Sequence, residues 1–174
     1  MHIDELDSRL LVTMRANPRI GLTELARLLG VARGTVQARV EKLTARGVIA
    51  DFGPTVVPEG IGYPILAFVS LQIAQGRLAE AVQALQDLPE ILEVYGTSGQ
   101  SDLLCRVVAR STPDLQEIIA RILTSPAVQR TDTTVALSVQ VPFRIEPLLE
   151  AAPGRVTGDL PAVPVTTAHR KTNR

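Results

Sequence analysis

The sequence is poor in the residues that most catalytic and metal sites use. Its 174 residues include one cysteine, two histidines, five aromatic residues and no tryptophan. A single Cys105 excludes an intrachain disulfide and a multi-cysteine metal cluster, and it suits a reducing, cytoplasmic setting. His2 and His169 lie near opposite ends of the chain, which argues against most histidine-dependent chemistry. We therefore expect no enzyme activity, no catalytic residue, no metal and no cofactor.

Long hydrophobic runs are also missing. No apolar run approaches the roughly 20 residues needed to span a bilayer, and the acidic first seven residues lack a signal-peptide core. No membrane partner is expected. Hydrophobic residues nevertheless make up 45% of the chain, which excludes wholesale disorder and suits one or two small domains.

Net positive charge, the usual mark of a nucleic-acid-binding chain, is absent overall because 18 basic side chains balance 18 acidic ones. The balance differs along the chain. Residues 1–50 carry eight basic and five acidic side chains, residues 51–150 six and twelve, and residues 151–174 four and one. The neutral total thus averages a mildly basic beginning, an acidic middle and a basic end.

The first 52 residues are predicted to form a winged helix-turn-helix domain. Apolar spacing indicates three helices, with Asp4 placed to cap the first and Thr23 the second. Gly30 supplies the turn before the third helix, and Gly47 follows that helix. Residues 48–52 look like a short strand, and the prolines and glycines of 53–63 mark a linker.

The region 64–145 is predicted to be a ferredoxin-like βαββαβ domain, giving an α+β chain overall. Strands are expected at 65–73, 91–97, 103–109 and 128–141, with helices at 77–88 and after Pro113. Several strands are apolar on both sides, so one sheet face is either covered by a second subunit or loosely patterned and partly exposed. We favour the homodimer. Residues 146–174 are expected to be a flexible basic tail, which either contacts DNA or is only a tail.

The third helix has the features of a DNA-recognition helix. Val36, Val40 and Leu43 define its buried side, and small residues at the centre of the opposite side allow a close approach to the major groove. Gln37 is suited to a base edge, and Arg39 to either a phosphate or an intradomain salt bridge. The alternative is a three-helix module that binds protein or only packs. The candidate DNA-binding residues are Thr23, Arg33, Gly34, Thr35, Gln37, Ala38, Arg39 and Lys42.

Taken together, these motifs resemble the Lrp/AsnC, or feast/famine, family of transcriptional regulators. The resemblance covers about residues 2–145. It rests on the strand order of 64–141 and on residues 4–11, 22–30, 35–36, 39–40, 43–49, 57–62, 99–102 and 128–133. It implies double-stranded DNA as a partner, a homodimer, and a higher oligomer such as a tetramer or octamer. Ala32 departs from the pattern, because the family commonly has a capping Ser at the start of this helix.

The resemblance also implies an amino acid or related small-molecule effector near the loop between the second and third strands. Glycines there expose backbone N–H groups that can receive a carboxylate, and Asp102 can accept from an ammonium group or order the loop. An ordinary hairpin loop is the alternative. The candidate effector-binding residues are Gly96, Gly99, Gln100, Ser101, Asp102, Thr131 and Thr133.

Two other functions compete with the DNA-binding regulator. One is an amino-acid-sensing oligomer whose N-terminal module binds protein. The other is a ferredoxin-like small-molecule enzyme, which would need an inward cluster of polar side chains. Region 64–141 has no histidine and only one tyrosine, Tyr95, and Cys105 sits in an apolar run without a visible base.

Overall fold

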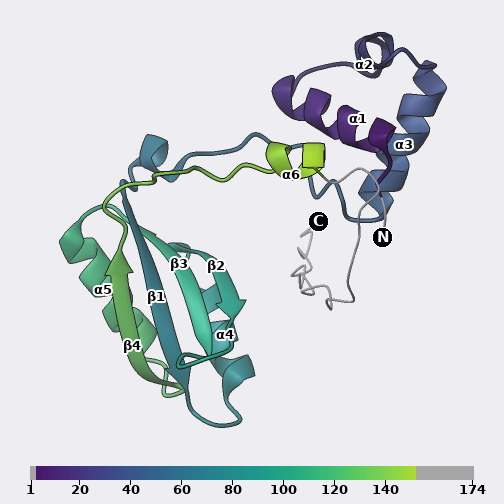
Figure 1. Cartoon of the computed structure of the whole chain (residues 1–174). Helices are drawn as coiled ribbons and strands as arrows, with labels where there is room; N and C mark the ends of the chain where they lie inside the picture. Colours follow the sequence, from purple (N-terminus) through teal and green to yellow (C-terminus); the bar gives the residue numbers. More distant parts are fainter. Residues whose placement is uncertain (1–2, 152–174) are drawn as a thin grey trace, which may run out of the picture. The chain divides into compact units, whose positions relative to one another are not determined.

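The computed structural model describes residues 3–151, and these fold into two compact units (Figure 1). The described part of unit 1 combines residues 3–52 with residues 143–151, and unit 2 comprises residues 53–142. The prediction of a flexible tail at 146–174 is wrong for residues 146–151, which form a helix that packs on unit 1, and its remainder falls outside the described residues. Each unit has its own hydrophobic core.

The described part of unit 1 contains four helices: α1 (Glu5–Ala16), α2 (Leu22–Leu29), α3 (Arg33–Ala45) and α6 (Glu146–Ala151). The predicted cap of α1 is confirmed, because Asp4 and Asp7 form a reciprocal capping box. Thr23 does not cap α2; its N-cap is Gly21, and Thr23 lies exposed within the helix. Gly30 follows α2 in the left-handed conformation, with a φ of +71°.

The wing predicted at residues 48–52 is wrong, since no described residue of unit 1 forms a strand. An isolated extended segment has no partner for its backbone groups, so it cannot be held as part of a sheet. The core of unit 1 instead closes with helices. Residues from α1, α2 and α3 are buried together, and Leu149 of α6 packs against them.

Unit 2 holds a four-stranded antiparallel sheet with the order β2-β3-β1-β4. Its strands are β1 (Ile65–Ile73), β2 (Ile91–Gly96), β3 (Leu103–Ala109) and β4 (Val128–Val135). The helices α4 (Leu78–Gln86) and α5 (Thr112–Leu123) cover one face (Figure 1). The predicted βαββαβ order is confirmed. A short 3-10 turn, Pro58–Ile61, precedes the sheet.

The last strand ends earlier than predicted, at Val135 rather than residue 141. β4 pairs with β1, and the final contact is the Ala136 N–H donating to the Leu66 carbonyl at 2.9 Å. Because β1 begins at Ile65, residues beyond 136 have no further strand to pair with. Alternating apolar residues after β4 are therefore exposed, including Leu137 and Phe143.

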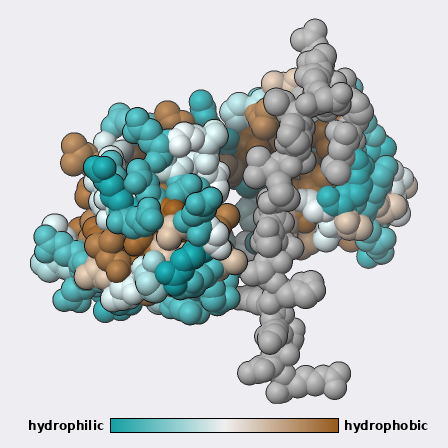
Figure 2. Space-filling model, turned by 90° about the horizontal axis from the view of Figure 1, so that it is seen from below, coloured by the Kyte–Doolittle hydropathy of each residue, from teal (hydrophilic) through white to brown (hydrophobic). Residues whose placement is uncertain are grey.

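Strand alternation divides the sheet residues between the two faces. Ala67, Val69 and Leu71 are buried beneath the helices with their neighbours on β3. The other face carries Phe68, which is 38% exposed, and Tyr95, which is 48% exposed. Figure 2 shows hydrophobic residues at the surface of unit 2.

Candidate DNA-binding helix and effector loop

Helix α3 separates an apolar side from an exposed polar side. Val36 and Leu43 are buried in the core of unit 1, and Val40 packs against it. The predicted groove-facing residues Arg33, Gly34, Thr35, Gln37, Ala38 and Lys42 are all exposed. Within the described residues, no ion pair engages Arg33 or Lys42. Their positive charges are therefore available to an anionic partner.

Arg39 has a structural role in unit 1. Its guanidinium donates to Asp4 at 2.5 Å and to Asp7 at 2.7 Å. The hydrogen bond from Arg39 is the main reason that the pKa of the Asp4 carboxyl lies below its ordinary value. Of the two predicted roles, the intradomain salt bridge is the one observed, and it joins α3 to the beginning of α1.

The start of α3 lacks a side-chain cap, as the sequence predicts from Ala32. Backbone bonds replace it in part, since the Thr35 and Val36 N–H groups both donate to the Ala32 carbonyl. Gln37 is held by a different contact, which the sequence pattern does not predict. Its amide donates to the Glu41 carboxylate at 3.0 Å. To read a base edge, Gln37 must exchange this exposed helix contact for one with DNA.

The β2–β3 loop is ordered from both sides by Asp102. Its carboxylate accepts from the Ile73 N–H at 2.7 Å, and its own N–H donates to the Leu71 carbonyl at 2.9 Å. Thr97 closes the loop with an N–H bond to the Asp102 carbonyl and a hydroxyl bond to the Ser101 carbonyl. Asp102 thus orders the loop, an arrangement that an effector site and an ordinary hairpin loop share.

The loop leaves several backbone donors without a partner in the described structure. Within residues 3–151, no hydrogen bond engages the N–H groups of residues 98–101. Gly99 has a φ of +136°, a conformation that favours glycine. The side chain of Gln72, which was not among the predicted residues, donates to the Gln100 carbonyl at 3.0 Å. Gly96, Gly99, Gln100, Ser101 and Asp102 therefore form one local group.

Thr131 and Thr133 are not part of that group. Both lie on β4 and pair with Leu71 and Val69 of β1, whose side chains lie on the helix-covered face. Residues opposite one another in an antiparallel pair share a face, so both threonines point toward the helix side of the sheet. β4 also lies at the sheet edge opposite β2. The structure does not bring these two candidates to the loop.

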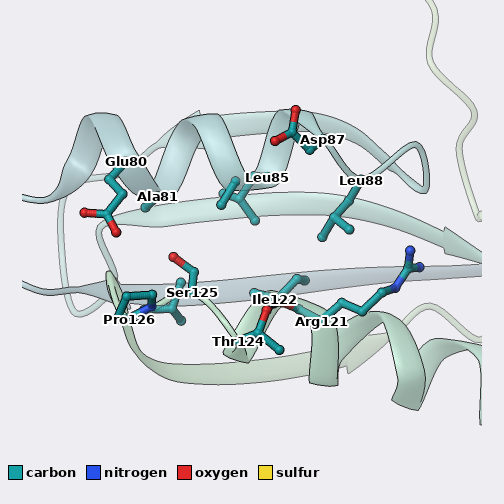
Figure 3. A pocket seen from close by; sticks show the side chains of 12 residues that line it. Glu80, Ala81, Leu85, Asp87, Leu88, Arg121, Ile122, Thr124, Ser125 and Pro126 are labelled. Atoms are coloured by element: carbon teal, nitrogen blue, oxygen red, sulfur yellow. Dashed lines mark hydrogen bonds between the residues drawn. The ribbon is translucent and has the colours of Figure 1, made fainter.

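Two further features bear on chemistry in unit 2. A groove of about 440 Å³ lies between α4 and α5, with Leu85 and Ile122 along it and Glu80 and Arg121 toward its ends (Figure 3). None of the predicted effector residues lines it.

Cys105 is fully buried, and burial raises the pKa of its thiol to about 11. At neutral pH this side chain is a thiol in an apolar core.

Among the described residues, no three His, Cys, Asp or Glu side chains come together to hold a metal ion. No described helix is both long and apolar enough to cross a membrane.

Comparison with known proteins matches both units. The sequence profile of the AsnC-type helix-turn-helix domain matches residues 3–44, and that of the Lrp/AsnC ligand binding domain matches residues 66–144. The regulatory protein AsnC of Escherichia coli is 32% identical over 147 residues, covering 83% of this chain and 97% of the relative. The HTH-type transcriptional regulator FL11 of Pyrococcus abyssi is 32% identical, covering 78% and 89%.

Solved structures agree with this relationship. The structure of E. coli AsnC has a TM-score of 0.78 at 31% identity and covers 84% of this chain and 100% of its own. A feast or famine regulatory protein from M. tuberculosis, complexed with L-methionine, has a TM-score of 0.74 at 29% identity and covers 81% and 96%. With both of its units matched, the chain belongs to the Lrp/AsnC family of transcriptional regulators.

Proposed function

We propose that the exposed side of α3 enters the major groove of double-stranded DNA and that the β2–β3 loop of unit 2 binds an amino acid or a related small metabolite. The observation that carries the DNA-binding part is the division of α3. One side closes the core of unit 1, and the other presents Arg33 and Lys42 with no ion-pair partner in the described residues. Small residues between them, Gly34 and Ala38, allow the backbone to approach the base pairs.

Roles on this helix follow from position and charge. Gln37 reads a base edge, Thr35 contacts a base edge or a phosphate, and Arg33 and Lys42 contact phosphates. Arg39 acts indirectly by fixing α3 to α1. The chain works in the cytoplasm as a binding protein rather than an enzyme, as the transcriptional-regulator names of its relatives suggest.

The effector proposal rests on the loop. The unpartnered N–H groups of residues 98–101 suit the carboxylate of an amino acid, and a related structure contains L-methionine. Asp102 holds the loop in shape. Asp102→Ala should abolish an amino-acid response of DNA binding, tested with a panel of the twenty amino acids. An unchanged response would move the effector site elsewhere.

The assembly proposal rests on the sheet face opposite the helices. Phe68 and Tyr95 are partly exposed there, and a soluble chain gains by covering such a surface with a second copy. A homodimer presents two copies of α3, and linked binding to two half-sites compensates for the modest positive charge of each copy of unit 1. Further association to a tetramer or octamer presents more copies of α3 for linked binding to DNA.

The experiment that tests DNA binding is a salt titration of affinity for sites found by genomic footprinting. Binding that neutralises phosphates weakens steeply as salt rises. Lys42→Ala should weaken binding to all duplexes and lower the salt slope by about one for each phosphate that the side chain neutralises. Gln37→Ala should instead reduce the preference for the footprinted sequence.

Arg77→Ala is the matched control, because it removes an exposed positive charge from unit 2. It should leave the salt slope unchanged. Equal affinities and slopes for wild type, Gln37→Ala and Lys42→Ala would refute the groove-facing assignment of α3.

A further inference from the structure

The C-terminal helix α6 returns to the N-terminal helix α1 and packs against it (Figure 1). The Ser8 hydroxyl donates to the Leu149 carbonyl at 2.5 Å, although the two residues are 141 positions apart. Ser8 is only 5% exposed, and Leu149 packs against the core of unit 1. Arg15 of α1 forms an ion pair with Glu146 at the start of α6.

Helix α6 packs against unit 1 through one of its sides only. Leu149 faces the core, whereas its neighbour Leu148 is 62% exposed. Glu150 borders a groove of about 420 Å³ lined by α1 and by Leu28 and Leu29 of α2. A helix of six residues is far too short to be stable alone in water. α6 is therefore helical because α1 holds it.

The contact between α6 and α1 gives the two units a second connection. The chain leaves unit 1 once, after Phe52, and comes back to it at Phe143. Ten residues, 136–145, join the end of β4 to the start of α6. Without α6, unit 1 is joined to unit 2 by one segment, through residues 53–64. With α6 docked, it is joined by two, and two attachments restrict motion that one permits.

The attachment also leads to the recognition helix. α1 receives α6 through Ser8, and the same helix begins with Asp4 and Asp7, which hold Arg39 of α3. We propose that α6 is a second tether, through which the state of unit 2 restricts the orientation of α3. This inference rests on the proposed DNA-binding function for its purpose, although the tether can be tested without DNA.

The test uses the full chain labelled with nitrogen-15 and compares rotational correlation times of the two units. Leu149→Ala removes the buried anchor, and Leu148→Ala is the matched control on the same helix. Hydrogen exchange at residues 146–151 and around Ser8 reports whether α6 has been released. On release, the correlation time of unit 1 should fall about twofold relative to unit 2, and Leu148→Ala should change nothing.

Rescue separates tethering from general damage to unit 1. Glu146→Arg should release α6, and Glu146→Arg combined with Arg15→Glu should restore both the protection and the correlation time. If Leu149→Ala exposes α6 to exchange while the two units still tumble together, the tether is refuted. A lower melting temperature with unchanged tumbling would also refute it, since that is the result of a purely structural helix.

A DNA readout then distinguishes this proposal from the proposed function. On duplexes with two footprinted half-sites at varied spacing, Leu149→Ala should lose roughly tenfold of the affinity advantage of the best spacing over the worst. If the wild-type chain binds no duplex but the tumbling result holds, the DNA-binding function fails and the tether stands. If wild type and Leu149→Ala show the same spacing dependence, the tether does not orient α3.

Discussion

Unit 1 and unit 2 reach a closed core in different ways. Unit 2 builds its core from one continuous stretch, β1 to β4, and its buried described side chains are all apolar. Unit 1 buries Asp7 and Ser8 as well, and both make contacts with distant residues, Arg39 and Leu149. Buried polar contacts thus add to the apolar core of unit 1, whereas the directional bonds of Asp102 in unit 2 lie in the exposed β2–β3 loop.

The largest expected effect is a loss of stability when a buried apolar side chain of unit 2 is truncated. Leu115→Ala, at a position 4% exposed on α5, should lower the free energy of unfolding of unit 2 by roughly 2–5 kcal/mol, because it leaves a cavity. Tyrosine fluorescence during denaturation reports unit 2 alone, since Tyr63 and Tyr95 are the only tyrosines. Leu123→Ala, at a position 47% exposed on the same helix, is the control. Equal losses for the two variants would contradict the assigned inward face of α5.

A smaller loss of stability is expected when a buried polar contact of unit 1 is removed. Arg39→Ala removes the partner of the Asp7 carboxylate, whose side chain is only 8% exposed, and should lower the stability of unit 1 by about 2–3 kcal/mol. Hydrogen exchange of the α1 amides measures it. Arg27→Ala removes an exposed pair with Glu24 and should have no measurable effect. If both variants behave alike, the Asp4–Arg39–Asp7 network does not organise unit 1.

The smallest expected effect is a pH dependence of the stability of unit 1. The folded pKa of Asp4 is depressed, so the stability that it contributes is complete above its unfolded pKa of about 3.9 and is lost as the pH falls through the folded value. Unit 1 should therefore lose α1 protection as the pH drops below about 4. Asp4→Asn keeps a good N-cap but has no carboxylate to titrate, and it should flatten this dependence. An unchanged pH profile in Asp4→Asn would assign the acid sensitivity to other groups.

Most of the successful predictions from sequence concern local patterns, although the predicted Thr23 cap, which is also local, was wrong. The limits of β1 and β3 were predicted as observed, because Pro64 and the turn after Ala109 bound continuous apolar runs. The Asp4 cap and the uncapped start of α3 were also predicted, since capping depends on neighbouring residues. These features need no knowledge of distant parts of the chain.

Prediction from sequence also failed where the answer depends on a partner far away in sequence. Residues 48–52 have strand composition but no strand to pair with, and β4 ends where β1 begins. The prediction that Thr131 and Thr133 join the effector loop missed the register of β4, which turns both toward the helix side. The role of Arg39 stayed open in the sequence because its partners lie more than thirty residues away.

The sequence alone determined the order of helices and strands and the apolar side of α3, because periodicity and turn residues act over a few positions. Only the tertiary structure decided which charged side chains of the described residues form ion pairs within the fold and which do not. It also decided that residues 146–151 form a helix at all. That helix has too few residues to be stable by itself, and its stability comes from α1, at the opposite end of the chain.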